Sequence, residues 1–171
     1  MKRTILLALL LTCGTAYANG DTPSVASNDN RAMTGHLHDG VLTVSLVARR
    51  GIWHPEGPQA PGFEIAAFGV KGGALTNPGP VLRVPAGTTI KVSVHNALMS
   101  ALTIHGLGAA PLIVPAGKIR ATRFVATAAG TFFYWGTTTG SELDRRFTAD
   151  AQLNGALVVD PPGANASDRV F

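Results

Sequence analysis

The chain has 171 residues, of which 14 are lysine or arginine and 10 are aspartate or glutamate, so its formal net charge is +4. So small an excess of basic residues does not support a nucleic-acid-binding patch. The length is that of one domain of ordinary size and leaves no room for a second full domain.

The first 18 residues have the pattern of a secretory signal peptide. A basic start is followed by an unbroken apolar run and a small-x-small tripeptide: Lys2-Arg3, Ile5 to Leu11 and Ala16-Tyr17-Ala18. The apolar run is shorter than the roughly 18 residues that a membrane span needs. We therefore expect cleavage after Ala18, export to the periplasm or the exterior, and no membrane anchor. A lipoprotein at Cys13 is the alternative, but Thr12 stands where such sites usually have a smaller residue.

Cleavage after Ala18 would leave 153 residues, with 12 basic against 10 acidic side chains and a net charge of about +2. The single cysteine of the chain, Cys13, would be removed with the signal peptide. The mature protein could then form no disulfide and no thiolate zinc site. It could also form no blue copper site, because that centre needs a cysteine sulfur beside two histidines.

Residues 19–35 are polar and show no apolar period, so we expect a flexible leader there. From residue 36 to residue 163 the pattern predicts one all-β domain, a sandwich or barrel of about seven to eight strands. Short segments rich in valine, isoleucine, threonine and aromatics alternate with Gly and Pro turns. The predicted strands are Val41–Ala48, Phe63–Val70, Pro80–Val84, Thr89–His95, Ala101–His105, Ile119–Ala126, Thr131–Trp135 and Gly155–Val159.

The histidines outside the later motifs have ordinary interpretations. His36 and His38 stand two apart, so on an extended chain both imidazoles would point to one side and could bind copper or zinc, although a solvated segment is the simpler interpretation. His54 lies among Gly and Pro residues and is expected at the surface. His95 alternates with the buried positions of its strand and should face solvent or a neighbouring domain. The Asp144-Arg145-Arg146 run is expected to be a solvated loop.

Five segments resemble, in order and spacing, the first cupredoxin domain of the multicopper oxidase family. They correspond to that family's "GPxLRVxxGD", "VxVxN", "HWHGL", "GTYWYHSH" and "QxxxGLxGxLIV" motifs, and together they extend over about residues 36–171. In this chain the five segments are 78–88, 92–96, 103–107, 130–135 and 152–159. The resemblance implies a Greek-key β-sandwich of the cupredoxin type and a copper-dependent oxidoreductase that uses dioxygen.

The copper motifs themselves depart from the family pattern. Two His-x-His motifs of the first domain supply half of the ligands to a trinuclear copper cluster in the family. Here the first motif keeps only His105, and the second has Trp135 and Thr137 in place of its two histidines. The resemblance therefore leaves His105 as the one candidate copper ligand within these two motifs. Phe133 and Trp135 are expected to pack in the core or at a surface between domains.

Three functions follow, and all remain open. The first is the amino-terminal domain of a multicopper-oxidase-type protein, inactive alone, with copper bound mainly by further cupredoxin domains in cis or in trans, or by other copies in a homo-oligomer. The second is a catalytically silent structural or binding module. In the first case residues 164–171 would be a linker into a missing following domain. A copper carrier that uses His36, His38 and His105 is a third possibility.

Overall fold

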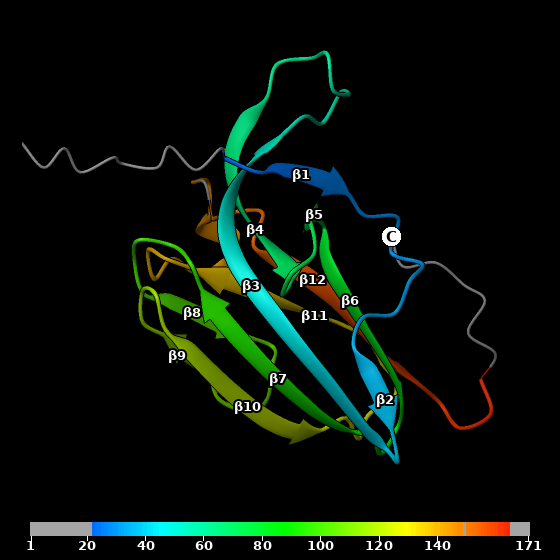
Figure 1. The fold of residues 1–171 in the computed structure, drawn as a ribbon. Coiled ribbons are helices and arrows are strands. Elements are labelled where there is room, and N and C mark those ends of the chain that lie inside the picture. Colours follow the sequence, from blue (N-terminus) through cyan, green and yellow to red (C-terminus); the bar gives the residue numbers. More distant parts are fainter. Residues whose placement is uncertain (1–21, 149, 165–171) are drawn as a thin grey trace, which may run out of the picture.

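The computed structural model describes residues 22–148 and 150–164, and in this part of the chain the strands form two sheets that pack face to face (Figure 1). The predicted signal peptide and residues 165–171 of the predicted linker lie outside the described residues. The described strands are β1 (Ser24–Ser27), β2 (His36–His38), β3 (Val41–Trp53), β4 (Phe63–Val70), β5 (Leu75–Asn77), β6 (Gly79–Pro85), β7 (Thr89–Asn96), β8 (Leu102–His105), β9 (Leu112–Val114), β10 (Ile119–Val125), β11 (Gly130–Thr137) and β12 (Asn154–Asp160).

One sheet has the strand order β1-β5-β4-β3-β7-β10, with β2 paired to β3, and the other has the order β6-β12-β11-β8-β9. Both sheets mix parallel and antiparallel pairs: β3 runs parallel to β7, and β6 runs parallel to β12. The single helical segment of the described chain is a 3-10 turn at Leu143–Arg145. The all-β prediction is therefore confirmed, and no described helix is long and apolar enough to cross a membrane.

All eight predicted strands are present, and Phe63–Val70 has the predicted bounds. Four further short strands raise the number to twelve in the described residues, above the seven to eight expected: β1, β2, β5 and β9. Each has only three or four residues, too few for an alternating pattern to be visible. These short strands form because each is hydrogen-bonded to a neighbouring strand.

The prediction of a flexible leader over residues 19–35 is wrong for Ser24–Ser27. This segment forms β1, which lies parallel to both β5 and β3 (Figure 1). Val25 is buried and packs in a small cluster with Ile65 and Leu75. One apolar side chain and a row of backbone hydrogen bonds thus hold a polar segment in the sheet, and composition alone does not reveal such pairing.

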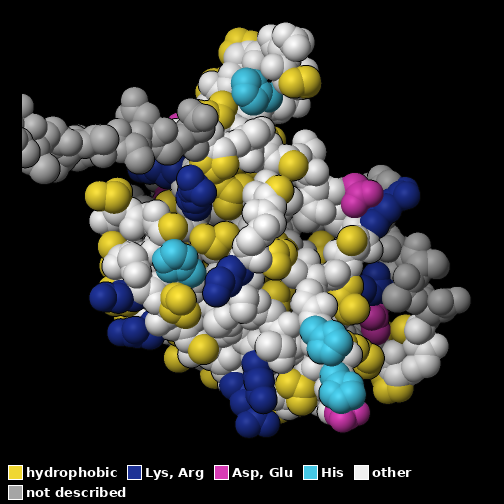
Figure 2. All heavy atoms as spheres, viewed as in Figure 1, with side chains coloured by type: hydrophobic (Ala, Val, Ile, Leu, Met, Phe, Trp, Pro, Cys, Tyr) yellow, Lys and Arg dark blue, Asp and Glu magenta, His cyan; other side chains and the backbone are white. Residues whose placement is uncertain are grey.

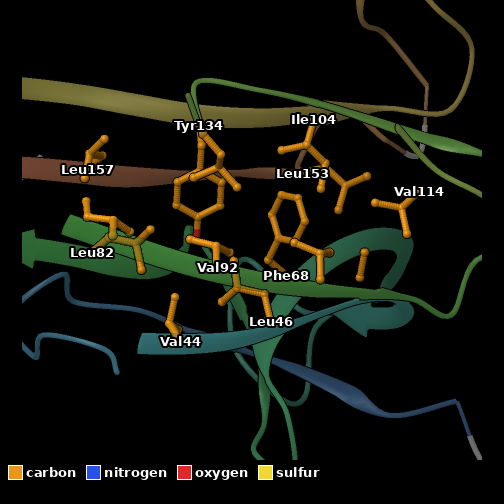
Figure 3. Close-up of a cluster of buried hydrophobic side chains, with 14 of the residues drawn as sticks. Val44, Leu46, Phe68, Leu82, Val92, Ile104, Val114, Tyr134, Leu153 and Leu157 are labelled. Atoms are coloured by element: carbon orange, nitrogen blue, oxygen red, sulfur yellow. The ribbon is translucent and has the colours of Figure 1, made fainter. Parts of the chain in front are cut away.

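The core lies between the sheets and follows the predicted alternation. On β7 the side chains of Ile90, Val92 and Val94 are buried, whereas Lys91 between them is exposed. Tyr134 of β11 is fully buried near Phe68, with ring centroids 5.4 Å apart (Figure 3). Burial by itself raises the pKa of the Tyr134 phenol. The phenol therefore stays neutral and donates a hydrogen bond of 2.6 Å to the carbonyl of Pro80.

Candidate functional site

The two segments that resemble the family's copper motifs in the sequence lie next to each other in the five-stranded sheet. Strands β8 and β11 pair antiparallel, with His105 opposite Trp135 and Thr103 opposite Thr137. Between them, Ile104 is fully buried in the core. Because alternate residues of a strand point to opposite faces, the four side chains share the outer face of the sheet as a two-by-two group, called here the β8–β11 square.

The imidazole of His105 stacks on the indole of Trp135. Their ring centroids are 4.1 Å apart and their planes differ by 9°. His105 is partly buried, and Trp135 is only 9% exposed. The chain turns away directly after His105 at Gly106, which has a φ of +80° and would place a Cβ atom 2.4 Å from the carbonyl oxygen of Phe133. The stack is thus held between two paired strands and a turn that needs glycine.

Arg146 covers the other aromatic member of this stack, with its guanidinium carbon 4.9 Å from the centroid of the Trp135 ring. Its side chain also donates to the carbonyl oxygens of Gly136, at 2.5 Å, and Ala151, at 2.9 Å. Burial lowers the pKa of Arg146, while the charge of Asp150 acts in the opposite direction. The prediction that Asp144-Arg145-Arg146 is a solvated loop is therefore wrong for Arg146, whose cation binds backbone carbonyls and an aromatic face.

Thr137, the fourth member of the square, is hydrogen-bonded to the buried carboxylate of Asp150. It is 3% exposed and donates to Asp150 Oδ2 at 3.1 Å. Asp150 is 2% exposed and also accepts hydrogen bonds from the Thr138 amide, the Thr138 hydroxyl and the Thr148 hydroxyl. Burial alone would raise the pKa of Asp150, but these hydrogen bonds hold it below its usual value. The carboxylate is charged and already saturated with donors.

The residues of the square do not fit a copper centre. A copper site of the kind implied by the resemblance is built from several imidazoles, and here His105 is the only one of the four. The Trp135 indole nitrogen is a donor without a lone pair for metal, and Thr137 is bound to Asp150. Among residues 22–148 and 150–164, no group of three or more His, Cys, Asp or Glu side chains is arranged to hold a metal ion.

The remaining histidines lie elsewhere on the molecule. His36 and His38 are exposed on β2 of the seven-stranded sheet, whereas His105 belongs to the five-stranded sheet. His54 is partly buried rather than fully at the surface, and its Nδ1 lies 2.8 Å from the carbonyl oxygen of Ala60. His95 on β7 is partly exposed, as its alternation predicts. The structure therefore does not bring together the three histidines of the copper-carrier alternative.

Beside the square, the outer face of the same sheet is partly apolar and open. Phe133 alternates with the buried Tyr134, so it faces outward, and it is 52% exposed. It lines a hollow of 460 Å³ that includes Leu143 and Ala156. A second hollow of 410 Å³ lies on the core side, because Phe124 and Leu157, which belong to or pack against the main core, line it together with Phe132. Of the two aromatic residues expected in the core or between domains, Trp135 is buried and Phe133 remains accessible.

Solved structures with the same architecture are copper proteins. A multicopper oxidase from Campylobacter jejuni described as a metallo-oxidase is 21% identical, covering 82% of this chain and 31% of that chain with a TM-score of 0.57. A copper nitrite reductase from Nitrosomonas europaea is 23% identical, covering 75% and 44% with a TM-score of 0.57. A multi-copper oxidase from Pseudomonas thermotolerans is 25% identical, covering 72% and 30% with a TM-score of 0.51.

These likenesses define a cupredoxin-like fold. The chain spans between 30% and 44% of the length of those three solved chains. No protein-family model and no curated protein sequence matches it. The fold expected from the resemblance is thus confirmed.

Proposed function

We propose that this chain is the first cupredoxin domain of a multicopper-oxidase-type protein, and that by itself it is a catalytically silent module. The observation that carries the proposal is the β8–β11 square. Positions 103 and 105 on β8 lie opposite positions 137 and 135 on β11, so four side chains share one face of the sheet. Two His-x-His motifs need this arrangement in order to share a metal cluster. Only His105 keeps the imidazole.

The loss of ligands and the retention of the framework support the silent role. Trp135 fills the position opposite His105 and stacks on it, while Arg146 lies over the Trp135 ring. Thr137 and Asp150 form a closed hydrogen-bond group. Trp135 and Thr137, which stand where the family has imidazoles, are therefore each engaged in contacts within the domain.

Copper chemistry in such a protein would depend mainly on other cupredoxin domains, in cis or in trans, or on other copies in a homo-oligomer. The partly exposed Phe133 and the hollow of 460 Å³ beside it give this face room for such a partner. His105 is partly exposed as well. This exposure favours a second candidate function, in which His105 donates one imidazole to copper held mainly by a neighbouring domain of an oxidoreductase.

The basic start, apolar run and small-x-small tripeptide of residues 1–18 support export of this protein, with a mature chain that begins at Asn19. The destination would be the periplasm or the exterior. Mass spectrometry of the amino terminus after expression with export would test this part, because an intact Met1 would contradict it.

The test of the silent role is a copper count. The protein carrying His36→Ala and His38→Ala, so that the exposed pair on β2 does not contribute, is mixed with Cu(II), passed through gel filtration and analysed for bound metal. We expect no copper above background. Roughly one copper per chain that disappears with the additional change His105→Ala would contradict the silent role and favour the second candidate.

A further inference from the structure

The strand β2 and the start of β3 form a tight hairpin. His36, Leu37 and His38 pair with Thr43, Leu42 and Val41, and the two residues between the strands are Asp39 and Gly40. Their φ angles are +47° and +70°. Two successive residues with positive φ in an Asp-Gly loop define a type I′ turn, the connection that best matches the twist of paired strands.

This hairpin fixes which way the side chains of β2 point. Leu37 is partly buried and packs against the main core, whereas His36 and His38 are exposed. The turn sets the register and Leu37 sets the face, so both imidazoles stand on the outer side of the strand. The two rings lie with centroids 6.1 Å apart and planes 25° apart. Figure 2 shows histidine side chains gathered where Figure 1 places β2.

A carboxylate lies against one of the two rings. Asp39 Oδ2 is 3.1 Å from Nε2 of His38. A carboxylate that holds one ring nitrogen fixes the orientation of the imidazole and leaves the other nitrogen free, which is a common arrangement around metal-binding histidines. His36 pairs with Thr43, and Thr43 pairs with Lys91 on the next strand. The basic Lys91 is therefore two strands, or about 10 Å, away from His36.

We propose that His36 and His38 form a two-imidazole chelating site for a late divalent transition metal, with Cu(II) bound most strongly. Imidazole suits copper, nickel and zinc, and the affinity of such sites for divalent ions rises to a maximum at copper. Solvent supplies the remaining ligands, because no third His, Cys, Asp or Glu in the described residues completes a group. The site is independent of the β8–β11 square and does not rest on the proposed function.

The hairpin matters to affinity because it holds both ligands in place before the metal arrives. The second imidazole then binds as an intramolecular ligand at high effective concentration. A flexible segment with the same two histidines would instead lose conformational freedom on binding, which weakens affinity. The exposed pair is thus preorganised by the turn at Asp39-Gly40 and by the buried Leu37.

The experiment is a Cu(II) titration of the purified protein by calorimetry, with electron paramagnetic resonance on the same samples. We expect one exposed copper per chain with nitrogen ligands. His36→Ala or His38→Ala should each weaken this binding by on the order of 100-fold, because either change removes the chelate. The matched control His105→Ala should leave it unchanged. Copper affinity that is unchanged in both single variants, His36→Ala and His38→Ala, would overturn the site. Loss of binding in His105→Ala would overturn it as well.

A second variant tests the role of the turn while both imidazoles remain. A Cβ atom at Gly40 would meet no other atom within 4 Å, so Gly40→Val acts only through its φ of +70°. A β-branched residue is strained there, and we expect Cu(II) affinity to fall at least several-fold. Far-ultraviolet circular dichroism would check that the sheets persist. Unchanged affinity in a folded Gly40→Val protein would overturn the preorganisation.

Discussion

At the scale of single residues, a few side chains are held by contacts that leave no room for change. Gly155 on β12 is one such position, since an added Cβ atom would lie 2.3 Å from the hydroxyl oxygen of Tyr134. The fully buried Tyr134 is itself anchored to Pro80. The Tyr134 phenol therefore occupies the space that a side chain at position 155 would need.

We expect Gly155→Ala to lower the free energy of unfolding by about 1–3 kcal/mol, the usual cost of overpacking a core. Gly73→Ala is the matched control, because its nearest contact would be an ordinary 3.5 Å. That control should change stability by no more than about 0.5 kcal/mol. Urea denaturation measures both, and equal effects of the two changes would contradict the packing argument.

The buried carboxylate of Asp150 gives a pH-dependent prediction. Its pKa is lowered in the folded protein by hydrogen bonds from Thr148, Thr138 and Thr137, which outweigh the effect of burial. A lowered folded pKa means that the carboxylate stabilises the protein at neutral pH and that this contribution is lost as the pH falls through the folded pKa. The difference in unfolding free energy between wild type and Asp150→Asn should therefore be large at pH 7 and shrink below about pH 4. Denaturant titrations at both pH values would show it, and an equal difference at both would contradict the assignment.

At the scale of elements, the amino-terminal strand β1 is part of the sheet although its composition is that of a leader. Its backbone is paired on both sides, and the amide of Ile52 donates to the carbonyl of Pro23 just before it. Val25 is its one buried side chain. The strand therefore depends on a single apolar contact together with its hydrogen bonds.

Val25→Asp should destabilise the protein by on the order of 2 kcal/mol, because it places a charge in an apolar cluster without a partner. Ala26→Asp, one position along the same strand and exposed, should have little effect. Hydrogen exchange of the Ile52 amide provides a local measurement, since Val25→Asp should reduce its protection. If both changes leave that protection intact, β1 does not hold this part of the sheet.

The sequence predicts the longer elements well because each has its own pattern. The alternation of Ile90, Val92 and Val94 identifies a half-buried strand without any knowledge of its neighbours. The hairpin at Asp39-Gly40 also has a local signal, the Asp-Gly pair between short strands, which could have revealed β2. The β1 strand has no such signal, because its partners are distant in the sequence and run parallel to it.

The candidate site, too, is only partly predictable from the sequence. The motif resemblance locates His105 and Trp135, and the pairing of β8 with β11 places them opposite each other. The roles of Arg146 and Asp150 are not visible in the sequence, because both depend on how the loop after β11 folds back over the sheet. The polar composition of this loop indicates only a solvated segment.

At the scale of the whole molecule, the two sheets separate two histidine sites with different properties. The exposed pair on β2 belongs to the seven-stranded sheet, and the β8–β11 square lies on the outer face of the five-stranded sheet. A cupredoxin-like framework that keeps its sheets and core but has one imidazole in the square is what a silent module requires. We propose that the other three positions of this square once held copper ligands.

The most direct measurement restores ligands to the square. The changes Thr103→His and Trp135→His, made in the protein that carries His36→Ala and His38→Ala, would give three imidazoles on one face while Thr137 keeps its bond to Asp150. Copper retained after gel filtration is then counted by elemental analysis, with the same variant lacking His105 as the control. We predict roughly one tightly held copper per chain that depends on His105. No gain of copper in a folded variant would contradict the claim that this square descends from a copper site.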